Sequence, residues 1–203
     1  MKIGIFGGTF DPPHIGHVNV CKRFAQSFDF DKLFVIPVSI PPHKAKKSKT
    51  TAEQRLDMCS IAFSSVSSNV AISDVEIKRE GKSYTADTIR YFIENGYDDI
   101  YFLCGTDMIL TLDMWYKPEY IFENATIVYV RREDDEELSK EIADKCNEYL
   151  KRFNAKIIKL DVDAIDISST EVRNIVKNDG DLSKYLSEEI IDYVKKHNLY
   201  KEV

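Results

Sequence analysis

The chain has 203 residues, of which 43% are hydrophobic, and its formal net charge is −6. This length and composition fit one globular domain with a substantial core. The negative net charge argues against binding of nucleic acid through a broad basic surface. We therefore expect a single domain over residues 1–203, in which local groups hold any anionic ligand.

The cysteines and the N-terminal segment indicate the cellular compartment of the protein. The four cysteines are spread along the chain without a Cys-x-x-Cys pair, which favours reduced thiols over a disulfide framework. The first apolar run ends at Gly7-Gly8, which makes it too short for a signal peptide or a membrane helix. We expect a soluble cytoplasmic protein with no membrane partner.

Strand-like and helix-like segments alternate along the whole chain. Apolar runs predict strands over residues 2–6, 33–37, 70–73, 100–104, 126–130 and 156–160. Helices are predicted to begin near His14, Thr51, Thr85, Glu136, Ser169 and Ser187. Strands separated by helices pair in parallel through right-handed crossovers, so the fold class is α/β, a doubly wound parallel sheet with helices on both faces.

Local signals support several of these boundaries. Thr51 with Gln54 fits a capping box at a helix start, while Gly96 and Asn198 are suited to left-handed helix stops. In a doubly wound sheet, ligands bind beyond the carboxyl ends of the strands. Gly7-Gly8, Gly105-Thr106-Asp107 and Arg131 each follow a predicted strand, so we expect them to converge at one edge of the sheet.

The segment from Gly7 to Pro13 lacks the G-x-G-x-x-G spacing of a dinucleotide-binding turn, so a nicotinamide-dependent dehydrogenase is not indicated. Its glycines would instead let backbone amides approach phosphate oxygens. His14 and His17 follow at helical spacing in a first turn, where amides and the helix dipole attract anions. Gly16 between them leaves room for a flat group.

Two other interpretations of these histidines are open. One is a surface histidine with its hydrogen bonds satisfied beside a buried histidine, without a ligand. The other is a zinc site, which is disfavoured because neither the Glu of H-E-x-x-H nor a third ligand lies nearby.

A second anion-binding helix start is predicted near the other end of the chain. Ser168, Ser169 and Thr170 place hydroxyls and consecutive amides there, with Arg173 one turn further on. Neutral donors and one fixed cation suit a polyphosphate, whereas a helix cap alone would need only one serine.

The opening Gly-Gly-Thr-Phe-Asp-Pro-x-His-x-Gly-His and the late Ile-Ser-Ser-Thr-x-Val-Arg resemble the nucleotidylyltransferase superfamily, whose fold is Rossmann-like. The middle motifs Pro41-Pro42-His43-Lys44, Ser83-Tyr84-Thr85-Ala86-Asp87-Thr88, Gly105-Thr106-Asp107-Met108 and Trp115 narrow the resemblance to bacterial nicotinate mononucleotide adenylyltransferases. The resemblance implies transfer of the adenylyl group of ATP to nicotinate mononucleotide, which gives nicotinate adenine dinucleotide and pyrophosphate in NAD biosynthesis.

The resemblance also implies roles for individual residues. Charge in the reaction would be stabilised by His14, His17, Lys44 and Arg173. ATP would be bound by Gly7, Gly8, Thr9, Phe10, Gly16, Gly105, Asp107, Arg131, Ser168, Ser169 and Thr170. Nicotinate mononucleotide would be bound by His43, Tyr84, Thr85 and Trp115. Mg²⁺ would arrive on ATP without a protein metal site, and a C-terminal helical segment, about 169–203, would complete the ATP site.

Some implied roles have alternatives within this sequence. Asp107, which would bind a ribose, could also cap the helix that follows, and Thr85 and Tyr84 could serve as a cap and as packing. Arg131 matches a family arginine, but Arg132-Glu133 replaces the usual Pro-Gly after it.

Other classes of protein share parts of this sequence pattern. Phosphopantetheine adenylyltransferases share the terminal motifs, and nicotinamide mononucleotide is an alternative acceptor. A nucleotide-binding module without activity could lose the histidines, which are present here. A class I aminoacyl-tRNA synthetase fragment shares His-Ile-Gly-His but needs a Lys-Met-Ser-Lys-Ser loop that this chain lacks. A homo-oligomer is possible.

Overall fold

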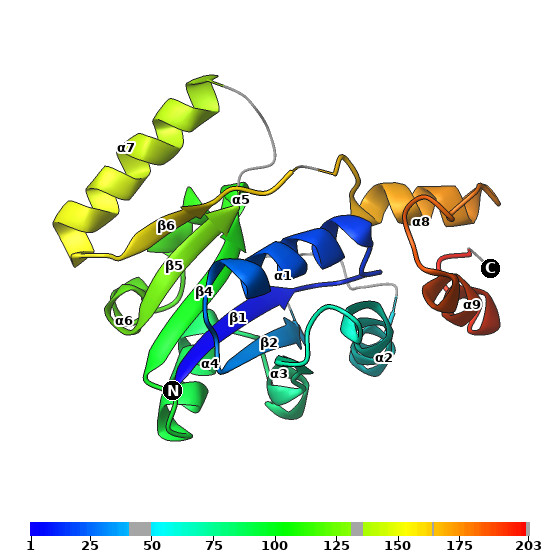
Figure 1. Ribbon diagram of the computed structural model, residues 1–203, viewed down its shortest axis with the longest axis horizontal. Coiled ribbons are helices and arrows are strands. Elements are labelled where there is room, and N and C mark those ends of the chain that lie inside the picture. Colours follow the sequence, from blue (N-terminus) through cyan, green and yellow to red (C-terminus); the bar gives the residue numbers. More distant parts are fainter. Residues whose placement is uncertain (41–49, 131–135, 164, 202–203) are drawn as a thin grey trace.

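The computed structural model describes residues 1–40, 50–130, 136–163 and 165–201. Six parallel strands form one sheet in the order β3-β2-β1-β4-β5-β6 (Figure 1). The strands are β1 (Lys2–Gly8), β2 (Lys32–Pro37), β3 (Val70–Ile72), β4 (Asp99–Gly105), β5 (Ala125–Val130) and β6 (Ile157–Leu160). The predicted doubly wound α/β fold is confirmed.

The helices connect successive strands and cover both faces of the sheet. The longer ones are α1 (Ile15–Ser27), α2 (Ala52–Phe63), α4 (Thr85–Glu94), α7 (Glu136–Phe153), α8 (Ser169–Lys177) and α9 (Glu188–Lys196). The shorter ones are α3 (Val75–Lys78), α5 (Thr106–Ile109), α6 (Pro118–Asn124) and the 3₁₀ turn η1 (Leu112–Met114). No helix of the described residues is long and apolar enough to cross a membrane.

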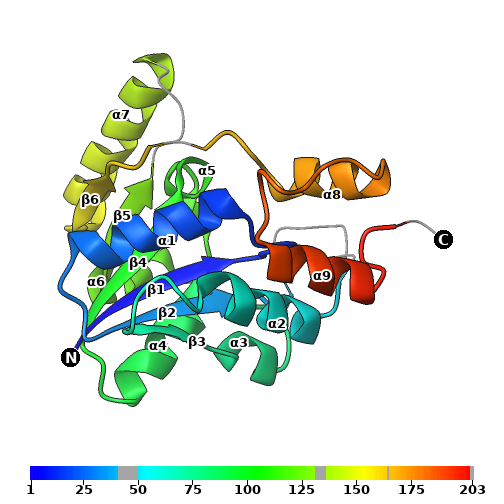
Figure 2. The same cartoon turned by 45° about the vertical axis from the view of Figure 1, so that its right-hand side comes forward.

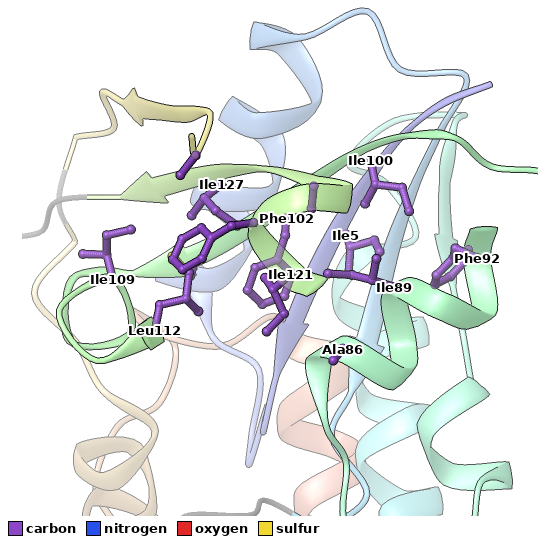
Figure 3. Packing of buried hydrophobic residues seen from close by; sticks show 14 of the residues in the cluster. Ile5, Ala86, Ile89, Phe92, Ile100, Phe102, Ile109, Leu112, Ile121 and Ile127 are labelled. Carbon is purple, nitrogen blue, oxygen red and sulfur yellow. The ribbon is translucent and has the colours of Figure 1, made fainter. Parts of the chain in front are cut away.

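Alternating side chains build a separate core on each face of the sheet. Phe102 of β4 packs with α4, α5, α6 and α7 on one face, whereas its neighbour Leu103 packs with α1 and α2 on the other. Figure 3 shows the first core, where Ile5 and Phe102 from the strands meet Ile89 of α4 and Ile121 of α6. Because each face is covered, the residues at the carboxyl ends of the strands are left to form the site.

The C-terminal helices form a third core on the side of α2. Val172 and Val176 of α8 and Ile190 and Val194 of α9 pack with Met58 of α2. In both views α8 and α9 lie at the opposite end of the molecule from α7 (Figures 1 and 2). The C-terminal segment is therefore attached to the half of the sheet that holds β1 and β2.

The sequence predicted all six strands and the six longer helices, with shifts of one or two residues at their ends. The capping box of Thr51 and Gln54 is present, and Gly96 and Asn198 have left-handed φ angles of 87° and 49°. The four short helical elements were not predicted, because one or two turns are too short to show a 3.6-residue period.

Candidate active site

Two cavities adjoin at the carboxyl ends of β1 and β4. The larger one, of about 450 Å³, is lined by Tyr84 and Thr85 at the start of α4 and by Trp115 after η1. The smaller one, of about 320 Å³, is lined by His17 of α1, by Gly105 at the end of β4 and by Thr106 at the start of α5. Gly7, Gly8, Asp107 and Met108 line both cavities.

The four residues that line both cavities form a shared wall between them, and the position of this wall follows from the strand order. β1 pairs with both β2 and β4, so the chain connections leave the sheet in opposite directions between β1 and β4. Ligands in open α/β sheets bind where the strand order reverses. The prediction that Gly7-Gly8 and Gly105-Thr106-Asp107 converge at one edge is confirmed.

The two histidines lie against each other at the start of α1. Their ring centroids are 3.8 Å apart, and the backbone amide of His14 donates to Nδ1 of His17 at 3.3 Å. Since that Nδ1 accepts a hydrogen bond, the ring proton of His17 belongs on Nε2, which makes Nε2 a donor. His17 lines the smaller cavity, where this donor can meet an anion.

Three details of this helix start differ from the prediction. His14 precedes the first turn, because it is the N-cap residue with extended backbone angles. The amide of Ile15 is not available to an anion, since it donates to the carbonyl of Tyr185 at 2.9 Å. The space beside Gly16 is filled by His14 itself, whose ring atoms would lie 3.1 Å from a Cβ on Gly16. Gly16 therefore accommodates the imidazole of His14 rather than a flat ligand.

The start of α8 is fastened to the segment that precedes His14. Arg173 donates to the carbonyl of Asp11 at 2.7 Å, and the hydroxyl of Ser169 donates to the carbonyl of Pro12 at 2.9 Å. Arg173 also donates to the hydroxyl of Thr170 at 2.9 Å. The structure thus brings together the two motifs, which are about 160 residues apart in the sequence.

The serine hydroxyls of α8 make hydrogen bonds within the protein. Ser168 is the N-cap residue, and its hydroxyl and amide both donate to the carboxylate of Glu171, at 2.6 and 2.7 Å. Ser168, Ser169, Thr170 and Arg173 do not line either of the two cavities. The cap interpretation of Ser168 is therefore confirmed, and binding of phosphate by this helix start stays a prediction.

Phe10 packs against Gly8, which is one of the residues that line both cavities. The side chain of Phe10 is 1% exposed, and its ring packs against Phe63 and His17 at centroid distances of 5.5 and 5.1 Å. A Cβ on Gly8 would lie 2.7 Å from this ring. Gly8 is thus required by the close approach of Phe10, and a role for Phe10 in binding ATP would be confined to its backbone and ring edge. Thr9, predicted on the ATP side, lines the larger cavity.

The larger cavity contains the predicted acceptor residues that the structure describes. Tyr84 is the N-cap residue of α4 and Thr85 the first helical residue, and the Tyr84 ring lies 4.6 Å from that of Tyr116. Asp107 is the second residue of α5, whose N-cap is Gly105. The alternative role of Asp107 as an N-cap is therefore wrong, and Asp107, which is exposed, lines both cavities.

The turn that presents Trp115 is anchored by α7. The hydroxyl of Tyr149 donates to the carbonyl of Ile109 at 2.9 Å and to the carboxylate of Asp113 at 3.0 Å. Lys145 also donates to Asp113, at 3.2 Å. These bonds join α7 to the segment between α5 and Trp115, so α7 holds one wall of the larger cavity.

Buried charged residues behind the site were not predicted. Arg55 of α2, which is 2% exposed, donates to the carbonyls of Thr9, Val38 and Ser39 and so joins the segments that follow β1 and β2. Burial lowers the pKa of Arg55 from its ordinary value, although the nearby Asp11 opposes this. No periodic pattern distinguishes such a residue from a surface arginine in the same helix.

Asp11 was part of a quoted motif, but it had no assigned role. Its carboxylate accepts hydrogen bonds from the hydroxyls of Thr50 and Tyr200, at 2.7 and 2.8 Å, and its carbonyl accepts from Arg173. Asp11 therefore joins the segment after β1 to α2, α8 and the C-terminal residues. Burial raises the pKa of the Cys21 thiol, in α1, to about 12.

Three predicted site residues, His43, Lys44 and Arg131, lie outside the described residues. Among the residues that are described, no group of three or more His, Cys, Asp or Glu side chains could hold a metal ion.

Comparisons with known proteins agree with this geometry. A family model described as cytidylyltransferase-like matches residues 5–175. A probable nicotinate-nucleotide adenylyltransferase of Clostridium novyi is 38% identical over 98% of this chain and 99% of its own length. One of Clostridium botulinum is 35% identical over 97% and 98%.

A solved structure has the same fold. The nicotinic acid mononucleotide adenylyltransferase of Plasmodium falciparum, in complex with NaAD, aligns with a TM-score of 0.76 at 23% identity, over 98% of this chain and 97% of its own. The chain belongs to the cytidylyltransferase-like family and, within it, to the nicotinate-nucleotide adenylyltransferases.

Proposed function

We propose that this protein transfers the adenylyl group of ATP to nicotinate mononucleotide, giving nicotinate adenine dinucleotide and pyrophosphate. The main support is the pair of cavities that share the wall of Gly7, Gly8, Asp107 and Met108. Two substrates that react directly need adjoining pockets with one common boundary. The names of the relatives agree with this reaction.

The smaller cavity suits the adenosine half of ATP. Asp107 can accept hydrogen bonds from ribose hydroxyls, and Gly105 exposes backbone there, since a Cβ on it would meet no atom within 4 Å. His17 at the start of α1, whose Nε2 is a donor, lines this cavity, and Asp11 and Pro12 before it are joined to the start of α8. We place the triphosphate between these two helix starts, with Arg173 as the cation that the described residues provide there.

The larger cavity suits nicotinate mononucleotide. Trp115 offers an aromatic surface for the pyridine ring, and its half-buried ring stays in contact with Phe102 at a centroid distance of 6.3 Å. Thr85, as the first residue of α4, can offer its hydroxyl and amide to the carboxylate.

The chemistry needs alignment and charge stabilisation. The phosphate of the mononucleotide attacks the α-phosphorus of ATP, the bond to the β-phosphate oxygen breaks, and pyrophosphate leaves with its electron pair. Because both reacting groups belong to substrates, the protein needs no nucleophile of its own. His14 and His17, with Lys44 and Arg173, would stabilise the charge that builds on the α-phosphate and on pyrophosphate. Mg²⁺ would enter as part of the ATP complex.

The decisive experiment measures pyrophosphate release from Mg-ATP with nicotinate mononucleotide, nicotinamide mononucleotide and phosphopantetheine side by side. We expect the highest kcat/KM with nicotinate mononucleotide. Release with phosphopantetheine alone, or with none of the three, would contradict the proposal. A cytoplasmic location, a homo-oligomer and completion of the ATP site by residues 169–203 belong to the same proposal.

A further inference from the structure

The tryptophan of the larger cavity has exposed neighbours on both sides in the chain. Met114 before it is 72% exposed, and Tyr116 after it is 44% exposed. Ring contacts join Trp115 to Phe102 and Tyr116 to Tyr84, at centroid distances of 6.3 and 4.6 Å. Apolar contacts are non-directional, so the orientation of this turn depends on its hydrogen bonds to other elements.

Asp113, two residues before Trp115, makes such hydrogen bonds. Its side chain is only 12% exposed. Oδ1 accepts from the hydroxyl of Tyr149 at 3.0 Å and Oδ2 from Lys145 at 3.2 Å, and Arg152 lies 3.5 Å from Oδ2. Three side chains of α7 thus converge on one carboxylate. Charge-assisted hydrogen bonds constrain direction as well as distance, so they fix the turn relative to α7.

The fold of this segment does not depend on Asp113 alone. Ile109 in the same segment is fully buried in the core on this face of the sheet (Figure 3). The Tyr149 hydroxyl has a second acceptor in the carbonyl of Ile109 at 2.9 Å, and Lys145 has one in Glu148 at 3.0 Å. Removal of the Asp113 carboxylate therefore leaves neither donor unsatisfied, and its main effect should be on the orientation of the residues that follow.

The residues around Asp113 belong to the larger cavity. Asp107 and Met108, at the start of the segment, line both cavities. The residues on either side of Asp113 line the larger cavity and not the smaller one, namely Thr111, Trp115 and Tyr116. A change at Asp113 should therefore affect the ligand of the larger cavity more than the ligand of the smaller one.

We propose that Asp113 is a positioning residue for the acceptor, which fixes the turn that presents Trp115 to the pyridine ring. This inference rests on the proposed function. Asp113 is not among the residues that line the two cavities, so it acts through Trp115. Contact with an aromatic ring contributes about two- to tenfold to affinity, and part of this is lost when the ring has to be ordered on binding.

The test compares KM for nicotinate mononucleotide with KM for ATP in the wild type, in Asp113→Ala and in Asp113→Asn. We expect Asp113→Ala to raise KM for the mononucleotide about three- to tenfold and KM for ATP by less than about twofold. Asp113→Asn keeps an oxygen that can accept from Tyr149. It should therefore restore KM for the mononucleotide to within about twofold of the wild type.

Asp57→Ala is the matched control. Asp57 of α2 also accepts from a tyrosine, Tyr193, at 2.8 Å, and neither residue lines a cavity, so both KM values should stay at the wild-type level. Should Asp113→Ala not fold, Tyr149→Phe tests the same bond. It removes the hydroxyl and keeps the ring against Phe122 at a centroid distance of 4.8 Å, and it should also raise KM for the mononucleotide selectively.

Two further readouts separate the positioning of Trp115 from a general loss of stability. If Asp113 acts through the ring, Asp113→Ala should change KM for the mononucleotide by less than about twofold in a Trp115→Ala background. Trp115 is also the only tryptophan of the chain. Its fluorescence should be quenched by acrylamide more readily in Asp113→Ala than in the wild type, and this measurement needs no substrate.

An equal rise in both KM values for Asp113→Ala would overturn the inference. The same rise in KM for the mononucleotide with and without the Trp115 ring, or unchanged quenching, would overturn it as well. A wild-type protein that releases no pyrophosphate with nicotinate mononucleotide would instead refute the proposed function, and the role of Asp113 toward the acceptor with it.

Discussion

Replacing Tyr200 by Phe should show how strongly the C-terminal residues hold the segment that precedes the histidines. The Tyr200 hydroxyl donates to Asp11 at 2.8 Å, and both side chains are 5% exposed. Burial raises the pKa of the Tyr200 hydroxyl, with Asp11 adding to the effect, so the neutral hydroxyl is the donor. The substitution removes this donor and changes little else in the packing of the ring.

The expected loss of stability follows from the burial of the acceptor. Hydrogen bonds to charged groups contribute about 1.5–3 kcal/mol, and an acceptor that stays buried after losing its donor keeps its full desolvation cost. Asp11 retains Thr50 as a second donor, which limits the loss. We therefore expect Tyr200→Phe to lower the free energy of unfolding by about 2 kcal/mol.

The chain offers a matched control in Tyr193→Phe. Tyr193 also donates to an aspartate, Asp57, at 2.8 Å, but this bond is exposed to solvent. Water can replace an exposed donor, so the control should lose less than about 0.5 kcal/mol. Urea unfolding at neutral pH, followed by circular dichroism, measures both variants against the wild type.

The activity of Tyr200→Phe provides a second readout. The carbonyl of Asp11 accepts from Arg173, so a loosened Asp11 disturbs the contact between the two helix starts. We expect kcat to fall severalfold with Tyr200→Phe and to stay unchanged with Tyr193→Phe. Equal losses of stability in the two variants would refute the reasoning that burial makes the Tyr200 bond strong.

Three further substitutions test the site. His17→Ala should lower kcat at saturating substrates by about a hundredfold or more with the fold intact, because it removes a donor for transition-state charge, and near wild-type turnover would exclude that role. Trp115→Ala should raise KM for nicotinate mononucleotide more than KM for ATP, because the ring lines only the larger cavity, and an equal rise in both would indicate a folding role. Gly16→Ala should gain up to about 1 kcal/mol from helix propensity yet lose activity, because its Cβ would press on the ring of His14, and unchanged kcat would refute that contact as a constraint.

The sequence predicted the parts of the site that depend on local chemistry. Glycines and histidines next to strand ends or helix starts define their own position once the strand order is known. Gly105, Asp107 and Thr85 are examples of such positions, because each follows or begins an element that is readable from periodicity, whereas Trp115 follows the short η1 and was assigned only through the family resemblance.

The parts that the sequence did not predict are made by contacts between distant residues. Tyr200 reaches Asp11 across 189 positions, and Arg55 reaches Thr9 across 46. The charged side chain of Arg55 predicts exposure, and its burial follows only from how the segments after β1 and β2 close over α2. Asp113 was missed for the same reason, since its turn η1 has only three residues and no periodic signal.

The motif from Ser168 to Arg173 can both hold the fold together and bind phosphate, and Arg173 shows how. A guanidinium has five N–H donors, of which one goes to the carbonyl of Asp11 and another to Thr170. These bonds fix the guanidinium beside the segment that leads to His14, while the remaining donors can still serve an anion. In the proposed ATP site, a cation that is already oriented in this way would lose little entropy when phosphate binds, which would be an advantage of using residues that also hold the fold together.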